Sequence, residues 1–168
     1  MKFLKIFGIS IKSGTVTVKY PFEEPLITNE FRGKIEIDPS KCTGCGACTR
    51  ICPSKALSMV IEGNSVTIRY FIGRCIFCGM CAEICPQNAI TITREFELAT
   101  DEIHDLYNDV EHEAMQCSCG NRFLTKKLVN EVAARVKHNA YELLQLCPEC
   151  RRRETVKRLT MKLTGIPR

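Results

Sequence analysis

The 168-residue chain contains no tryptophan and only three histidines, so any metal it binds would have to be held almost entirely by thiolates. It also lacks a run of roughly 18 to 20 apolar residues, the length that a membrane-spanning helix needs. Lysines interrupt the first twelve residues and no small-residue cleavage site follows them, which argues against an export signal. Cysteine, in contrast, is abundant, with twelve residues. Cysteines in an unexported chain are more often metal ligands than disulfides, so we expect an intracellular metalloprotein.

Eight of the cysteines belong to two copies of one motif, C-x₂-C-x₂-C-x₃-C-P. The first copy spans Cys42–Pro53 and the second spans Cys75–Pro86, a displacement of 33 residues. This spacing is the bacterial ferredoxin run, in which thiolates bind cubane iron–sulfur clusters. Gly44, Gly46 and Gly79 suit such loops, because the backbone amides must approach the cluster closely and often require positive φ.

Each copy separates its fourth cysteine from the first three. Three closely spaced cysteines can bind three corners of one cube, while a short helical turn carries the fourth to the neighbouring cube. The expected ligands of the first [4Fe–4S] cluster are Cys42, Cys45, Cys48 and Cys85, and those of the second are Cys75, Cys78, Cys81 and Cys52. With cysteine at every ligand position no iron is open to substrate, so we expect single-electron transfer and no catalytic residue.

The remaining cysteines form a third group, consisting of Cys117, Cys119, Cys147 and Cys150. A Cys-Pro-x-Cys pair is common in structural zinc sites, so we expect these four thiolates to bind a structural Zn²⁺. A rubredoxin-like iron site and free thiols are the alternatives. His112 or His138 could also replace one of the four ligands.

The expected fold class is α+β, a bacterial-type two-cluster ferredoxin core with extensions at both ends. We assign the core to 34–95, an N-terminal amphipathic segment and extended arm to 1–33, and a helical, zinc-binding extension with a basic tail to 96–168. Short alternating segments predict strands at 35–37 and 90–93.

Between the two motifs, segments 58–60 and 66–70 bracket a Gly-Asn turn and predict a β-hairpin. Helical spacing of apolar residues predicts one helix through 103–114 and a clearer one through 128–144. The turns after the third cysteine of each motif are expected to be helical and to end at the proline.

The first twelve residues have a basic, amphipathic pattern. Their apolar residues at helical spacing are Phe3, Leu4, Phe7 and Ile11, and their lysines are Lys2, Lys5 and Lys12. Such a segment favours an anionic interface. The alternative is a helix that packs on its own domain. Alternation at 15–18 predicts a short extended segment after it.

Together with the paired cysteine motifs and this basic start, Tyr20-Pro21 and Phe31-Arg32-Gly33 carry a resemblance over roughly residues 1 to 98. The chain resembles the two-cluster ferredoxin subunit of complex I (the 23 kDa, TYKY-type subunit). It is still more similar to the corresponding subunit of membrane-bound group 4 [NiFe] hydrogenases and formate hydrogenlyases. The Cys-Pro-Glu-Cys element near the end also resembles the extension of the formate hydrogenlyase subunit.

The resemblance implies an electron-transfer subunit of a membrane-associated oxidoreductase, without a substrate site of its own. It implies a peripheral position on the cytoplasmic side of the cell membrane, with residues 1–12 at lipid or at a membrane subunit. The implied partners are a small iron–sulfur subunit, a donor module and the membrane arm.

Three alternatives differ from a hydrogenase-type subunit. The chain could serve a complex I-type quinone oxidoreductase, or it could be a free ferredoxin-like carrier. A nucleic-acid-binding or redox-sensing protein would use the basic tail, 151–168, on phosphate, but no aromatic residues are interleaved with that tail, and we expect no nucleic-acid partner.

Overall fold

The computed structural model describes residues 3–14, 19–23, 25, 27–136 and 141–164. The chain divides into two compact units, Met1–Phe31 and Arg32–Arg168. The extended segment predicted at 15–18 lies outside the described residues, as do Lys2 and His138.

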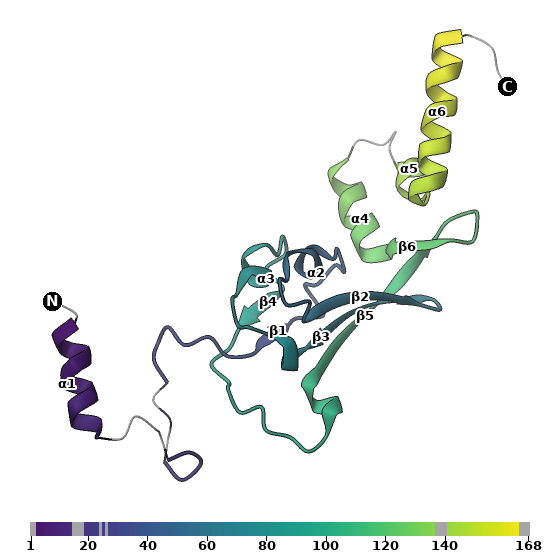
Figure 1. Cartoon of the computed structure of the whole chain (residues 1–168). Coiled ribbons are helices and arrows are strands. Elements are labelled where there is room, and N and C mark those ends of the chain that lie inside the picture. The colour runs from purple at the N-terminus through teal and green to yellow at the C-terminus, as the bar shows by residue number, and fades with distance from the viewer. Residues whose placement is uncertain (1–2, 15–18, 24, 26, 137–140, 165–168) are drawn as a thin grey trace. The chain divides into compact units, whose positions relative to one another are not determined.

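The first unit contains helix α1 (Phe3–Ser13), as its apolar spacing predicted (Figure 1). Its large apolar side chains are exposed to 65–68%, namely Leu4, Ile6, Phe7, Ile9 and Ile11. Lys5 and Lys12 are seven residues apart and therefore lie on one side of the helix. None of the described helices, this one included, has the length and apolar composition that crossing a membrane requires.

The second unit begins with the predicted ferredoxin elements. Strand β1 (Ile35–Ile37) pairs antiparallel with β4 (Ile90–Ile92), so the segments that flank the duplicated region lie side by side. Strands β2 (Leu57–Glu62) and β3 (Ser65–Phe71) form the predicted hairpin, and a short 3₁₀ turn, η1 (Ile72–Arg74), follows it. The sequence predictions for these strands are confirmed.

Helices α2 (Ala47–Ile51) and α3 (Met80–Glu83) are the predicted turns after the third cysteine of each motif. The two helices contact each other, and each also contacts a strand, β2 for α2 and β4 for α3. The duplicated motifs therefore fold as a pair, with their helical turns adjacent.

The helix predicted through 103–114 is wrong. A 3₁₀ turn, η2 (Ile103–Leu106), is followed by the ten-residue strand β5 (Tyr107–Gln116), which pairs antiparallel with β3 along its length. Val110 and Ala114 are buried in it. A separation of four residues brings two side chains to one face of a helix or of a strand, so this pattern could not separate the two. The partner strand β3 decides between them.

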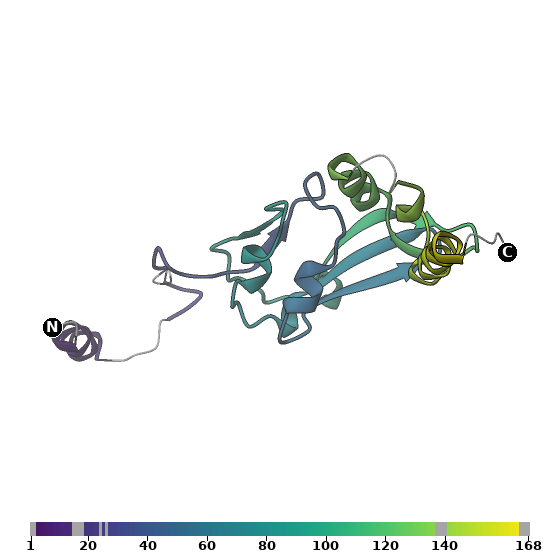
Figure 2. The ribbon, with the colours of Figure 1, turned by 90° about the horizontal axis from the view of Figure 1, so that it is seen from above.

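The sheet has the order β2-β3-β5-β6, and its last strand is β6 (Arg122–Thr125). Helix α4 (Lys126–Arg135) follows it at once and contacts β5 (Figures 1 and 2). The continuous helix predicted through 128–144 is too long, because Val136 has extended backbone and ends α4. Helices α5 (Tyr141–Leu144) and α6 (Pro148–Thr164) complete the chain, and α6 carries most of the basic tail.

The core lies between the two sheets and the helical turns. Ile68 and Tyr70 of β3 are 1% exposed, and they pack in one cluster with Ile35, Leu57 and Val110. Because Val110 comes from β5, the segment after the cysteine motifs contributes directly to the core of the cysteine-bearing region.

Thr125 joins the C-terminal segment to the first cysteine loop. Its side chain is fully buried, donates a hydrogen bond to the Thr43 carbonyl and accepts one from the Leu128 amide at the start of α4. Lys127 reaches the same loop, where its Nζ donates to the Ser40 and Pro39 carbonyls, the latter at 3.2 Å. Hydrogen bonds from the C-terminal segment thus stabilise the loop that contains the first cysteine motif.

We expect Thr125→Val to destabilise the second unit by about 1–3 kcal/mol. The change keeps the shape of the side chain but leaves the buried Thr43 carbonyl without its donor and α4 without its N-cap. Urea denaturation of the cluster-loaded chain, followed by circular dichroism, measures the shift. Thr155→Val, at an exposed position in α6, is the matched control. Equal midpoints for the two variants would contradict this role of Thr125.

Candidate metal centres

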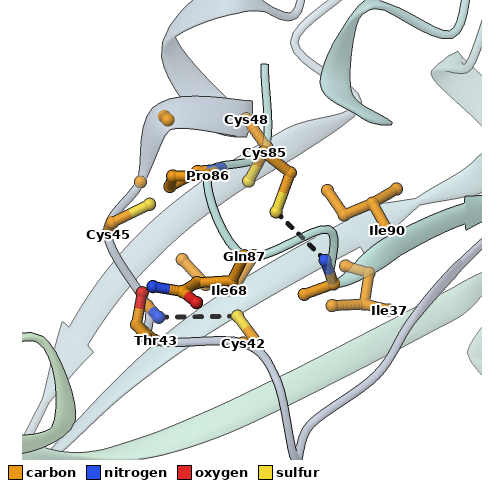
Figure 3. Close-up of a pocket in the computed structure, with 14 residues that line it drawn as sticks. Ile37, Cys42, Thr43, Cys45, Cys48, Ile68, Cys85, Pro86, Gln87 and Ile90 are labelled. Carbon is orange, nitrogen blue, oxygen red and sulfur yellow. Dashed lines mark hydrogen bonds between the residues drawn. The ribbon is translucent and has the colours of Figure 1, made fainter. Parts of the chain in front are cut away.

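The structure brings four cysteines of two different motifs around one cavity. Cys42, Cys45 and Cys48 of the first motif and Cys85 of the second line this cavity (Figure 3). Apolar side chains, including Ile37, Ile68 and Ile90, line the same cavity. We call this the first cavity.

The second cavity has the reciprocal composition. Cys75, Cys78 and Cys81 of the second motif and Cys52 of the first line it. The fourth cysteines are therefore exchanged, in the arrangement that the spacing predicted.

The two motifs share backbone conformation as well as sequence. Gly46 and Gly79, which precede α2 and α3, both have left-handed backbone, with φ of 71° and 81°. The position two residues after the first cysteine is also left-handed in both, with φ of 67° at Gly44 and 54° at Phe77. Positive φ turns successive amides toward one side of the loop, which makes a concave surface for an anion.

Backbone amides point at the thiol sulfurs in both cavities. The Gly44 and Phe77 amides each lie 3.4 Å from the sulfur of the first cysteine in their motif, and the Ala89 amide lies 3.3 Å from Cys85 Sγ. Amide donation stabilises the ionised form of a thiol. At Cys52, burial alone would raise the pKa, but hydrogen bonds from Ser54 and from nearby amides outweigh it, so the pKa is lowered.

The pKa of the most buried cysteine in each cavity indicates that the four thiols need a positively charged partner. Burial, followed by the charge of neighbouring thiolates, raises the pKa of Cys48 to about 12 and that of Cys81 to about 11. Four thiolates can therefore be ionised together only beside a positively charged group. The iron of an iron–sulfur cluster supplies such a charge, so this donor set fits a cluster in each cavity.

Tyr70 supports the same conclusion for the second cavity. Its hydroxyl is buried beside Cys75, and the residue lines the second cavity. Burial, and then the neighbouring Cys75, raises the pKa of this hydroxyl, so it stays a donor. A buried hydroxyl needs an acceptor, and the Cys75 sulfur, as a cluster ligand, would be one.

His112 contacts Cys42, a residue of the first cavity, and does not lie in the third cysteine group, where it was a candidate ligand. Its Nε2 is 3.3 Å from Cys42 Sγ. Burial, and then the charge of Lys127, lowers the pKa of the imidazole. Sequence analysis missed this position, because a lone histidine in a segment with helical spacing gives no sign of a cysteine seventy residues away.

Arg32 is a second residue that the sequence did not single out for this role. Its Nη1 donates to the Cys78 carbonyl at 2.6 Å and so fixes a loop of the second cavity from the start of the unit. The next residue, Gly33, cannot carry a side chain, because a Cβ there would lie 2.2 Å from the Glu95 carbonyl oxygen.

The four cysteines of the third group come together as predicted. Their sulfur atoms all lie within 4.8 Å of one another, and the Cys119 and Cys147 sulfurs are 3.7 Å apart. Cys117 and Cys119 follow β5, and Cys147 and Cys150 lie at the start of α6, so the group is formed where the end of this strand meets the last helix.

The spacing of these sulfurs suits one metal ion. Zinc–sulfur bonds of about 2.3 Å in a tetrahedron place sulfurs about 3.8 Å apart. A cubane cluster would hold them farther apart, since the whole cube has to fit between them. Hydrogen bonds from the Cys119 and Cys147 amides lower the pKa of Cys117 to about 6, whereas contacts with the other three thiols raise that of Cys150 to about 12.

The amino-acid sequence of the chain is similar to those of known iron–sulfur proteins. Two family models, each described as a 4Fe-4S dicluster domain, match residues 34–86 and 10–56. Formate hydrogenlyase subunit 6 of Escherichia coli (strain K12) is 39% identical over 154 residues, which covers 86% of this chain and 86% of that protein. The chain belongs to the formate hydrogenlyase subunit 6 family. The resemblance inferred from its motifs is therefore confirmed.

Other relatives of this family are similar over shorter lengths. The chloroplastic NAD(P)H-quinone oxidoreductase subunit I of Daucus carota is 35% identical, over 68% of this chain and 75% of that protein. A chain in the structure of an archaeal membrane-bound sulfane sulfur reductase is 31% identical, with a TM-score of 0.42 and coverage of 52% of this chain and 48% of that one.

Proposed function

We propose that this chain is an electron-relay subunit of a membrane-associated oxidoreductase, with one [4Fe–4S] cluster in each cavity. The observation that carries the proposal is the pair of cavities, each lined by three cysteines of one motif and the fourth cysteine of the other. The first cavity would bind its cluster through Cys42, Cys45, Cys48 and Cys85, and the second through Cys75, Cys78, Cys81 and Cys52. Clusters held in this way take up and release single electrons.

The absence of an open ligand position argues for a relay and not for a self-sufficient enzyme. Four cysteines can satisfy every iron of a cubane cluster, so substrate would have no iron to bind. Because the motifs exchange their fourth cysteines, the two cavities are neighbours within one core. Two adjacent one-electron sites suit transfer between partners on either side.

Exchanging one ligand at a time tests the assignment. We expect Cys52→Ala to impair the cluster bound by the second motif and to leave the first-motif cluster in place, because Cys52 lines the second cavity. Cys85→Ala is the reciprocal variant and is expected to impair the first-motif cluster. Iron content and the EPR spectrum of the reduced full chain measure both. If each variant instead lost the cluster of its own motif, the exchanged ligation would be refuted.

The relatives support a place in a hydrogenase-type assembly. Formate hydrogenlyase subunit 6 matches this chain over more of both lengths, and at higher identity, than the quinone oxidoreductase subunit of Daucus carota does. The partners would be a small iron–sulfur subunit, a donor module and a membrane arm. Helix α1, with its exposed apolar side chains and with Lys5 and Lys12, would contact the membrane surface or a membrane subunit on the cytoplasmic side.

Isolation of the tagged full chain from its native membranes tests this placement. We expect it to migrate as part of a large assembly with other oxidoreductase subunits, among them a nickel-binding large subunit. Phe7→Glu combined with Ile11→Glu places two charges on α1 and is expected to release the chain from membranes.

Ser10→Gln, which changes a side chain of the same helix without adding a charge, is the control and is expected to stay bound. A wild-type chain that runs only as a small free species would favour the free-carrier alternative. Unchanged membrane fractionation of the Phe7/Ile11 variant would contradict the role of α1.

We further propose a structural Zn²⁺ bound by Cys117, Cys119, Cys147 and Cys150. The sulfur spacing supports a single tetrahedral ion, and Cys117 and Cys147 are 3% and 1% exposed, as suits a closed structural site. The ion would hold the start of α6 against the turn between β5 and β6. Arg151 supports this corner, since it donates to the Leu143, Leu144 and Leu146 carbonyls.

Metal analysis of the purified chain tests the zinc site. We expect one equivalent of zinc besides the iron of the two clusters, and we expect Cys147→Ser to lose the zinc and to keep the cluster iron. Ser118→Ala, which changes an exposed residue between two of the ligands, is the control and should retain zinc. Iron in place of zinc would identify a rubredoxin-like site, and no bound metal would contradict the site altogether.

A further inference from the structure

The C-terminal segment brings an imidazole to the first cavity. His112 lies on β5 opposite Val66 of β3, inside a continuous antiparallel pairing, so its position is set by the sheet and not by a loop. Its Nε2 lies 3.3 Å from the sulfur of Cys42, the first cysteine of the first motif. This is hydrogen-bond distance for a nitrogen–sulfur pair.

The loop of the first motif has a residue that leaves room for this ring. A Cβ at Gly44 would lie 2.8 Å from His112 Cδ2 and 2.5 Å from Thr125 Cγ2, so only glycine permits both side chains to approach. The equivalent residue of the second motif is Phe77, at a similar left-handed φ. The two motifs therefore differ at this position. In the first motif it is a glycine, and His112 and Thr125 of the C-terminal segment pack against it.

The second cavity has no corresponding imidazole among the described residues. Apart from His112 the described part of the chain contains one histidine, His104, which is exposed in η2. The contact with His112 thus distinguishes the first cavity from the second, although the two have equivalent cysteines and equivalent amide donors.

The chemistry of the contact defines its direction. A cysteine sulfur bound to iron has no proton, so it can only accept, and the imidazole must donate through its Nε2 hydrogen. Donation to a ligand sulfur stabilises the reduced cluster more than the oxidised one, because reduction adds negative charge. We propose that His112 donates to Cys42 Sγ and thereby raises the reduction potential of the cluster in the first cavity. This inference rests on the cluster binding proposed above.

His112→Leu in the full, cluster-loaded chain tests the proposal. We expect the midpoint potential of the first-cavity cluster to fall by the equivalent of about a tenfold change in its reduced-to-oxidised ratio, about 59 mV for one electron. The second-cavity cluster should keep its potential. EPR-monitored redox titration measures both, with the signals assigned from Cys52→Ala and Cys85→Ala. Iron content reports cluster binding separately, so a failure of cluster assembly is distinguished from a failure of His112 to tune it.

Two matched variants separate hydrogen bonding from packing. His112→Gln retains an N–H donor of similar reach and is expected to keep the potential near the wild-type value. His104→Leu makes the same substitution at an exposed site and should change neither potential. A wild-type potential in the Leu variant, or an equal fall in the Gln variant, would overturn the proposal.

A measurement on the unsubstituted chain covers the case in which His112→Leu does not assemble its cluster. With ¹⁵N-labelled histidine, pulsed EPR of the reduced first-cavity cluster is expected to detect a weak ¹⁵N coupling through the hydrogen bond. The labelled His112→Gln variant should lose this coupling. Absence of the coupling in the wild-type chain would refute the contact.

Discussion

The exchange of the fourth cysteine between the two motifs is the constraint on which the rest of the structure depends. Cys52 must reach the second cavity and Cys85 the first, so α2 and α3 have to lie against each other and the flanking strands β1 and β4 have to pair. Burial makes this arrangement costly without a positive partner, as the raised pKa values of Cys48 and Cys81 indicate. Bound iron would therefore contribute to folding as well as to electron transfer.

The segment after the motifs does more than extend the chain. Strand β5 contributes Val110 to the core, and β6 and α4 place Thr125 and Lys127 on the loop that precedes and contains Cys42. The four-cysteine group lies at the far end of this segment, between the turn after β5 and the start of α6. Strand β5 also carries His112. One strand therefore contributes Val110 to the core and brings the imidazole of His112 to Cys42 Sγ.

Sequence and structure agree where the chemistry fixes the spacing. Cysteine spacing predicted the two cavities and the third group, because the ligand geometry of a metal site dictates that spacing, and local alternation around a turn predicted the β2–β3 hairpin. They disagree at β5. Val110 and Ala114 fit a helix and a strand equally well, and the choice was made by β3, whose residues lie some forty positions earlier.

The sequence by itself determined which cysteines gather in the two cavities, how the two motifs exchange their fourth cysteine and to which family the chain belongs. These follow from the residue type of the ligands and from a motif spacing that is specific to one kind of metal site. Only the tertiary structure decided that the C-terminal segment joins the sheet, that Arg32 fixes the Cys78 loop and that His112 faces Cys42. Such contacts depend on long-range strand pairing, which brings together residues that share no local pattern.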